Sequence, residues 1–150
     1  MSTNGDLRNT ELHISPDGLL TITAAYAPST HVHQPDSVYC RYFVVPIIGA
    51  APWATWARLV EYLPDNDTDQ VGLVYDELAR SLGNSPGRFT KTLQRLVSFH
   101  LIDYHPDTPH VLFVRRRAPN LSPANLARLT ERCPTLAASH HEHHHPPGRP

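Results

Sequence analysis

The sequence predicts one α+β domain built from three helices, a β-hairpin and an additional C-terminal helix. Three observations predict it: apolar residues recur at helical spacing, proline stands at the start of three of the four helical segments, and two β-rich runs flank a proline-containing turn. A chain of 150 residues, 40% of them hydrophobic, is long enough for one domain with a core. We expect a flexible or partly ordered segment over 1–37, this domain over 38–133, and a disordered His/Pro-rich tail over 134–150.

Composition and termini predict a cytoplasmic protein without a membrane partner. No apolar run approaches the roughly 20 residues that cross a bilayer, and the first 15 residues lack the basic and apolar regions of a signal peptide. Cys40 and Cys133 form no CxxC motif and no disulfide framework. Two free thiols in a reducing compartment are therefore the simplest interpretation.

The first half of the chain predicts two extended segments and one helix. The apolar residues of 18–26 favour a short strand. The β-branched and aromatic residues of 37–48 favour a strand that stops at Pro46, with a helix entering the core as the alternative. Pro52 suits the first turn of a helix that runs to about Leu63, whose tryptophans, Trp53 and Trp56, recur at helical spacing with other apolar residues.

The second half predicts three more helices and a hairpin. After an acidic loop, 71–74 is a strand stub, and 75–83 is a helix with Gly83 as its left-handed cap. Ser85 caps a third helix that has Pro86 in its first turn and continues to about His100. Residues 101–117 form a hairpin with a wide turn, and 122–133 form a helix that Pro134 stops or kinks. A helical turn or two can follow before the disordered tail.

Charge is distributed unevenly along the chain. Nine of the 13 Lys and Arg residues lie in 80–132, which carries a formal charge of +6, while the remainder carries −7. In the third helix, an apolar side holds Phe89, Leu93, Leu96, Val97 and His100, and a second side holds Arg88, Lys91, Thr92 and Arg95 without an acidic residue. This cationic stripe is either a solvated face or a surface that meets an anion such as a phosphate backbone.

The segment around this stripe resembles a helix-turn-helix, in which the second helix enters the major groove of DNA. Together with the helix before it and the hairpin after it, residues 50–117 resemble a winged helix-turn-helix domain. The segments "LARSLG", "LQRLVSFHLI" and "FVRRRAPNLSPANLARLTE" are similar to poorly characterised actinobacterial winged-helix proteins. The third segment is the most particular of them, and the family has no established ligand or target.

The resemblance implies a set of DNA-binding residues. The exposed side of the recognition helix matches Arg88, Lys91, Thr92 and Arg95. Its N-terminal entry matches Asn84 and Ser85. The base of the wing matches Arg115, Arg116 and Arg117. Strand alternation prevents the last three from all pointing the same way. The hairpin tip departs from the pattern, because it has no Lys or Arg and carries Asp107.

Other candidate chemistry is sparse. If the tail is helical, the pairs His140/His144 and His141/His145 stand at i,i+4 and could bind Zn, Ni or Cu. No Cys, His or carboxylate motif completes a metal site with them. The sequence therefore implies no metal or other cofactor. The sequence has no GxSxG, P-loop, GxGxxG or HExxH motif, and the acidic residues of 65–69 lack the glycine and glutamate of a calcium loop. We expect no enzymatic activity.

The sequence therefore predicts a protein that binds double-stranded DNA, regulates transcription and forms a homodimer, joined through Leu126 and Leu129 or the N-terminal segment. Three alternatives stay open. The first is a winged-helix module for protein association that uses the tryptophans and the acidic remainder. The others are a component of plasmid or phage replication and, more remotely, a metal sensor that uses the His tail.

Overall fold

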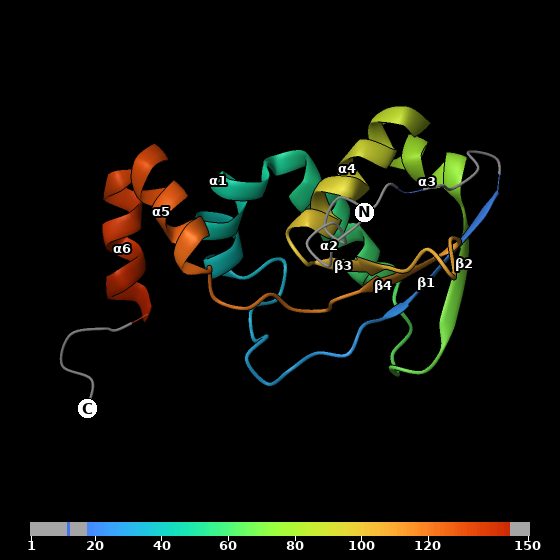
Figure 1. Ribbon diagram of the computed structural model, residues 1–150, viewed down its shortest axis with the longest axis horizontal. Coiled ribbons are helices and arrows are strands. Elements are labelled where there is room, and N and C mark those ends of the chain that lie inside the picture. The colour runs from blue at the N-terminus through green and yellow to red at the C-terminus, as the bar shows by residue number, and fades with distance from the viewer. Residues whose placement is uncertain (1–11, 13–17, 145–150) are drawn as a thin grey trace, which may run out of the picture.

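The computed structural model describes Leu12 and residues 18–144, with side chains described to His140. These residues form six α-helices, a π-helical segment and a four-stranded mixed sheet, which is the predicted α+β class. Figure 1 shows α5 (Pro123–Arg132) and α6 (Pro134–His144) at one end of the molecule, with β2 (Gln70–Val74) and α3 (Tyr75–Ser81) at the other.

The sheet has the strand order β2-β1-β4-β3. The strand β1 (Leu19–Ala24), predicted over 18–26, pairs antiparallel with β2 and parallel with β4 (Val111–Val114). The strand β4 also pairs antiparallel with β3 (Ile102–Tyr104), which forms the predicted hairpin. Leu20 and Ile22 of β1 are fully buried, whereas Leu19 is exposed, so alternation along β1 turns one side of the sheet toward the core.

This sheet differs from the one that the resemblance implied. A sheet made only of the stub at 71–74 and the hairpin would place β2 beside the hairpin. The structure instead inserts β1 between β2 and β4, with Thr21 opposite Gly72 on one side and Val111 on the other. The segment before residue 38 therefore supplies an internal strand of the sheet.

The strand predicted over 37–48 is wrong, and the alternative, a helix that enters the core, is confirmed. A π-helical segment (Cys40–Val44) leads into α1 (Val45–Ile48). The π-helical segment ends two residues before Pro46, whose ring and missing N–H interrupt the regular hydrogen-bond pattern. The buried side chains of this segment recur at helical spacing, as adjacent pairs four residues apart: Tyr39 and Cys40, Phe43 and Val44, and Ile47 and Ile48.

The helix α2 (Ala50–Tyr62) forms where the sequence predicts it, with Pro52 in its first turn. Trp56 is fully buried, and its indole N–H donates to the backbone oxygen of Arg115 at 2.8 Å. Trp53 is partly buried and donates to the backbone oxygen of Pro35 at 2.7 Å. Both indoles thus tie α2 to segments that are distant in the sequence.

The predicted pair of helices is formed by α3 and α4 (Pro86–Ser98), joined by a tight turn. Gly83 has a φ of 75°, and its N–H and that of Asn84 donate to the oxygens of Arg80 and Ala79, both at 2.9 Å. These two bonds define a Schellman C-cap, which glycine adopts without steric cost. Ser85 then caps α4 by accepting the N–H of Arg88 at 3.3 Å, as predicted.

The C-terminal part is more helical than the sequence predicted. Ser122 caps α5 by accepting the N–H of Asn125, as expected. Beyond it, α6 runs for 11 residues from Pro134, where a helical turn or two was expected before a disordered tail. Among the described residues, no helix has the length and hydropathy needed to cross a membrane.

Candidate nucleic-acid interface

The cationic residues of α4 lie opposite its apolar side, as the helical spacing predicted. Phe89, Leu93, Leu96 and Val97 are buried against the rest of the protein. The solvent-facing side consists of Gly87, Arg88, Lys91, Arg95 and Ser98, all exposed. His100 does not extend the apolar side, because α4 ends at Ser98 and His100 is exposed beyond it.

Arg88 and Lys91 are the available cations of this helix. Both are exposed, and neither side chain makes an ion pair or hydrogen bond with any residue in the described part of the chain. They lie in the first half of α4, next to Ser85 and the half-buried Asn84. The free N–H groups of a helix N-terminus add partial positive charge at the same place.

The expectation that Thr92 lies on the exposed stripe is wrong, because only 9% of its surface is accessible. At 100° per residue, Thr92 lies about 40° from Arg88 on the side toward Phe89 and Leu96. Its short, branched side chain is therefore covered where a longer one would reach solvent. A contact between Thr92 and DNA has no support in this geometry.

Arg95 belongs to the exposed side of α4 but is bonded within the protein. Its Nε donates to the oxygen of Ile48 at 2.7 Å, and its Nη2 donates to the oxygen of Ile47 at 3.0 Å. The guanidinium carbon also lies 5.2 Å from the ring centroid of Phe99. Arg95 thereby satisfies carbonyl groups at the C-terminal end of α1 and fixes α1 against α4.

Arg115 is mostly buried and forms part of an internal network. Its Nη2 donates to Asp103 Oδ2 at 3.0 Å in a salt bridge, with side-chain exposures of 18% for Arg115 and 31% for Asp103. Its Nη1 lies 3.3 Å from Nε2 of His31. Burial, with the positive charge of Arg115 as a second cause, lowers the pKa of His31. Arg115 thus joins β4 to β3 and to the segment after β1.

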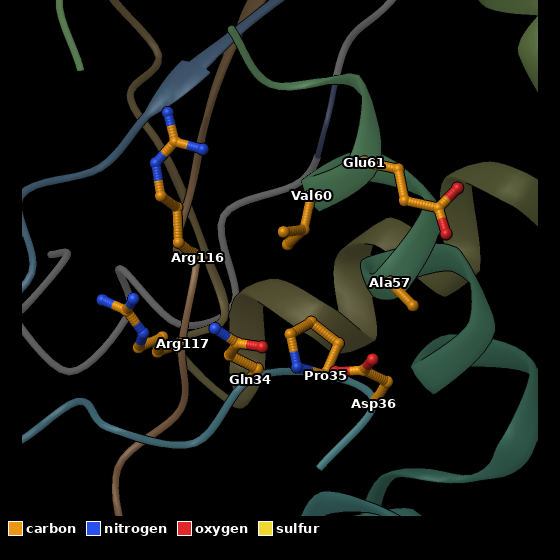
Figure 2. Close-up of a pocket in the computed structure, with 8 residues that line it drawn as sticks. All are labelled: Gln34, Pro35, Asp36, Ala57, Val60, Glu61, Arg116 and Arg117. Carbon is orange, nitrogen blue, oxygen red and sulfur yellow. The ribbon is translucent and has the colours of Figure 1, made fainter. Parts of the chain in front are cut away.

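Arg116 is engaged in a similar way, whereas Arg117 is exposed. Arg116 Nε donates to Asp67 Oδ1 at 3.1 Å, and its Nη2 donates to the oxygens of Pro64 and Asn66. Figure 2 shows Arg116 and Arg117 beside a cavity of about 360 Å³ that Ala57, Val60 and Glu61 of α2 also line. No α4 residue lines this cavity. Of the three arginines, only Arg117 has no ion pair or hydrogen bond to a described residue.

The candidate metal pairs of the tail are not assembled by the described side chains. His140 is buried, and its Nε2 lies 2.8 Å from the hydroxyl of Tyr39, so this imidazole holds α6 against the core. The side chains of His141, His144 and His145 lie outside the described residues. In the described part of the chain, no group of three or more His, Cys, Asp or Glu residues could hold a metal ion.

The histidine–tyrosine contact was not predicted from the sequence. Tyr39 stacks on the ring of His33 at a centroid distance of 3.7 Å, and its hydroxyl accepts the N–H of Leu121 at 2.9 Å. The only sequence signal was an aromatic residue in an apolar run. The pairing with His140 spans 101 residues, so no local pattern reports it.

The two cysteines are free thiols in the structure, as expected. Cys40 is fully buried, and burial raises the pKa of its thiol, which disfavours the nucleophilic thiolate. No protein-family model, curated protein or solved structure matches this chain.

Proposed function

We propose that this chain binds double-stranded DNA through α4, as a winged-helix regulator of transcription. The observation that carries the proposal is the pair Arg88 and Lys91, exposed on the capped first half of α4 without a partner in the described part of the chain. Neither cation forms an ion pair with another described residue, so the fold does not use their charges. An adjacent phosphate backbone would attract both and release counterions.

The order of elements supports a winged helix. Reading along the chain, α2, β2, α3, α4, β3 and β4 follow the order helix, strand, helix, helix, hairpin. With 13 residues, α4 is about 20 Å long, and a helix fits the roughly 12 Å width of the major groove. The internal position of β1 and the acidic hairpin tip are departures from the pattern, so the proposed contact centres on α4 rather than on the wing.

The proposed DNA surface is smaller than the sequence implied. Arg88 and Lys91 would contact phosphates or guanine edges, and Asn84 and Ser85 would contact the backbone or a base at the entry of α4. Arg95 would act indirectly, by holding α4 against α1. Arg117 would contact DNA only outside the α4 surface, and the salt-bridged Arg115 and Arg116 would serve the fold.

A homodimer remains part of the proposal, because specific sites commonly consist of two half-sites. Leu129 is fully buried within its own chain, so a contact through α5 would use the partly buried Leu126, with the N-terminal segment as the alternative. The rival proposal of a protein-association module that uses the tryptophans loses support, because Trp56 is buried and the indole of Trp53 is bonded to Pro35.

The test measures DNA binding of Arg88→Ala/Lys91→Ala by fluorescence anisotropy on mixed-sequence duplexes at several salt concentrations. We expect the wild type to bind at low salt, and the double variant to bind at least tenfold more weakly, with a salt slope smaller by about 2. Both side chains are exposed, so the unfolding midpoint should stay nearly unchanged.

The matched control is Arg41→Ala/Arg58→Ala, which removes two cations outside α4. Arg41 precedes α1 in the π-helical segment, and Arg58 lies on α2 paired with Glu61. Equal weakening by the control would show that only net charge matters. A wild-type protein that binds no duplex even at low salt would exclude the proposal.

A further inference from the structure

A groove separate from the cavity beside Arg116 and Arg117 lies between α1, the C-terminal end of α4, the segment 118–122 and α5. It has a volume of about 640 Å³, within the range of small-molecule sites, and it is separate from the first half of α4. We propose that this groove binds a small organic anion with an apolar body. The site goes beyond DNA binding and stands independently of it.

The lining of the groove suits an apolar body. Val44, Ile47 and Ile48 come from the helical segment that enters the core, Leu101 follows α4, and Leu121 precedes α5. Val44, Ile47, Ile48 and Leu101 belong to the core, so they form a fixed apolar wall. These four side chains are almost fully buried, so the apolar surface that a ligand would remove from water comes mainly from Phe99 and Leu121, which are partly buried and also line the groove.

Arg95 supplies a cation whose position is already fixed. Two of the five N–H groups of its guanidinium donate to Ile47 and Ile48, and the remaining donors are not used in a described contact. The contact with the ring of Phe99 restrains the guanidinium as well. Because the side chain is ordered before a ligand arrives, an anion would bind it at a small entropic cost.

Arg128 supplies a second cation, from α5. It is exposed, lines the groove, and has no side-chain partner among the described residues. Ser122, Ala124 and Asn125 also line the groove, so the partially positive N-terminal end of α5 borders it. His100 adds an imidazole that can donate a hydrogen bond in either protonation state.

Negative groups are missing from this lining. Among the described residues that line the groove, none is Asp or Glu. Near the end of α4, the carbonyls of Leu96 and Val97 are already satisfied, because Leu101 donates to Leu96 and His100 donates to Val97, both at 3.0 Å. Two arginines beside an apolar wall therefore complement a carboxylate, sulfonate or phosphate carried on an aromatic or aliphatic body.

The test uses the fluorescent sulfonate 8-anilinonaphthalene-1-sulfonate and its neutral analogue N-phenyl-1-naphthylamine on the full chain. We expect the sulfonate to bind at one site per chain and the neutral analogue at least tenfold more weakly. Arg128→Gln should weaken binding of the sulfonate about tenfold, the usual effect of losing one charged hydrogen bond. Amide NMR shifts should map to Ser98, Ala124 and Asn125, which line the groove.

Lys91→Gln is the matched control, because it removes one exposed cation from α4 outside the groove and should leave the affinity unchanged. Ala124→Phe adds a bulky side chain at the exposed edge of the groove and should weaken binding without touching a charge. The Arg88→Ala/Lys91→Ala protein should bind the sulfonate normally, which separates this site from DNA binding.

Three results would overturn the proposal. Equal weakening by Arg128→Gln and Lys91→Gln would show a general charge effect. Equal affinity for the neutral analogue would remove the role of the arginines. A dimer that Arg128→Gln dissociates in sedimentation experiments would place a second copy of the chain in the groove instead of a small anion.

Discussion

At the first half of α4, Arg88 and Lys91 extend from the surface without a partner in the described part of the chain, whereas Arg95 near the other end donates to Ile47 and Ile48 of α1. The three residues lie on one side of one helix and look equivalent in the sequence. Their surroundings give them different roles: the first two keep all their donors for a ligand, and the third uses part of its guanidinium to hold two helices together. Helical spacing alone therefore does not show which cations of a charged stripe have all their donors free and which also hold the fold together.

The largest expected difference in stability between the two ends of α4 is that between Arg95→Gln and Lys91→Gln. Removing the guanidinium deletes two hydrogen bonds to α1 carbonyls and the contact with Phe99, so we expect the free energy of unfolding to fall by about 2 kcal/mol. Lys91→Gln should change it by less than about 0.5 kcal/mol, because this side chain is exposed and unpaired among the described residues. Urea unfolding followed by circular dichroism measures both, and equal effects would contradict the distinction between the two ends.

A smaller effect is expected from Ser85→Ala. Losing the N-cap leaves the N–H of Arg88 without its acceptor and should cost about 1 kcal/mol. Ser98→Ala at the other end is the comparison, because Ser98 Oγ donates at 2.6 Å to the oxygen of Arg95, which also accepts the N–H of Phe99. We expect that change to cost less than about 0.5 kcal/mol in the same unfolding experiment. The reverse order would show that the cap does not stabilise α4.

The smallest effect, and the only stabilising one, is expected from His100→Gly. His100 has a φ of 61° in a Schellman cap like that of Gly83, where a side chain is strained by about 1 kcal/mol. Because glycine also adds entropy to the unfolded chain, the net gain should be about 0.5 kcal/mol. Lys91→Gly, in the middle of α4, should instead destabilise by about 1 kcal/mol. Thermal unfolding of the two variants should show opposite shifts of the midpoint.

Local signals predicted most of the helices. Ser85 with Pro86, and Ser122 with Pro123, start α4 and α5 as a cap and a first-turn proline should, and Gly83 ends α3 in the left-handed conformation. These signals work because the groups that interact lie within a few residues of one another. The apolar run at 37–48 gave no such signal, since a helix with its apolar residues facing the core contains the same β-branched and aromatic residues as a strand.

The candidate site was predicted only in part, because partners distant in the sequence decide which cations are free. The spacing placed Arg88 and Lys91 on the surface correctly, but Arg95 finds its acceptors 47 and 48 residues away. Arg116 pairs with Asp67, 49 residues before it. Nothing in the neighbourhood of either arginine indicates these bonds. The groove with Arg128 has the same origin, since its walls come from three separate stretches of the chain.

The internal position of β1 has a consequence for how the chain folds during synthesis. Thr21 of β1 is paired with Val111 of β4, about 90 residues later. At roughly 5–20 residues per second, β1 leaves the ribosome about 5–20 s before its parallel partner exists. The other partner, β2, is made about 50 residues after β1, so β1 pairs with β2 first and the sheet is completed only when β4 follows. A chain shortened to begin after Ala24 would lack β1 and could not form this four-stranded sheet.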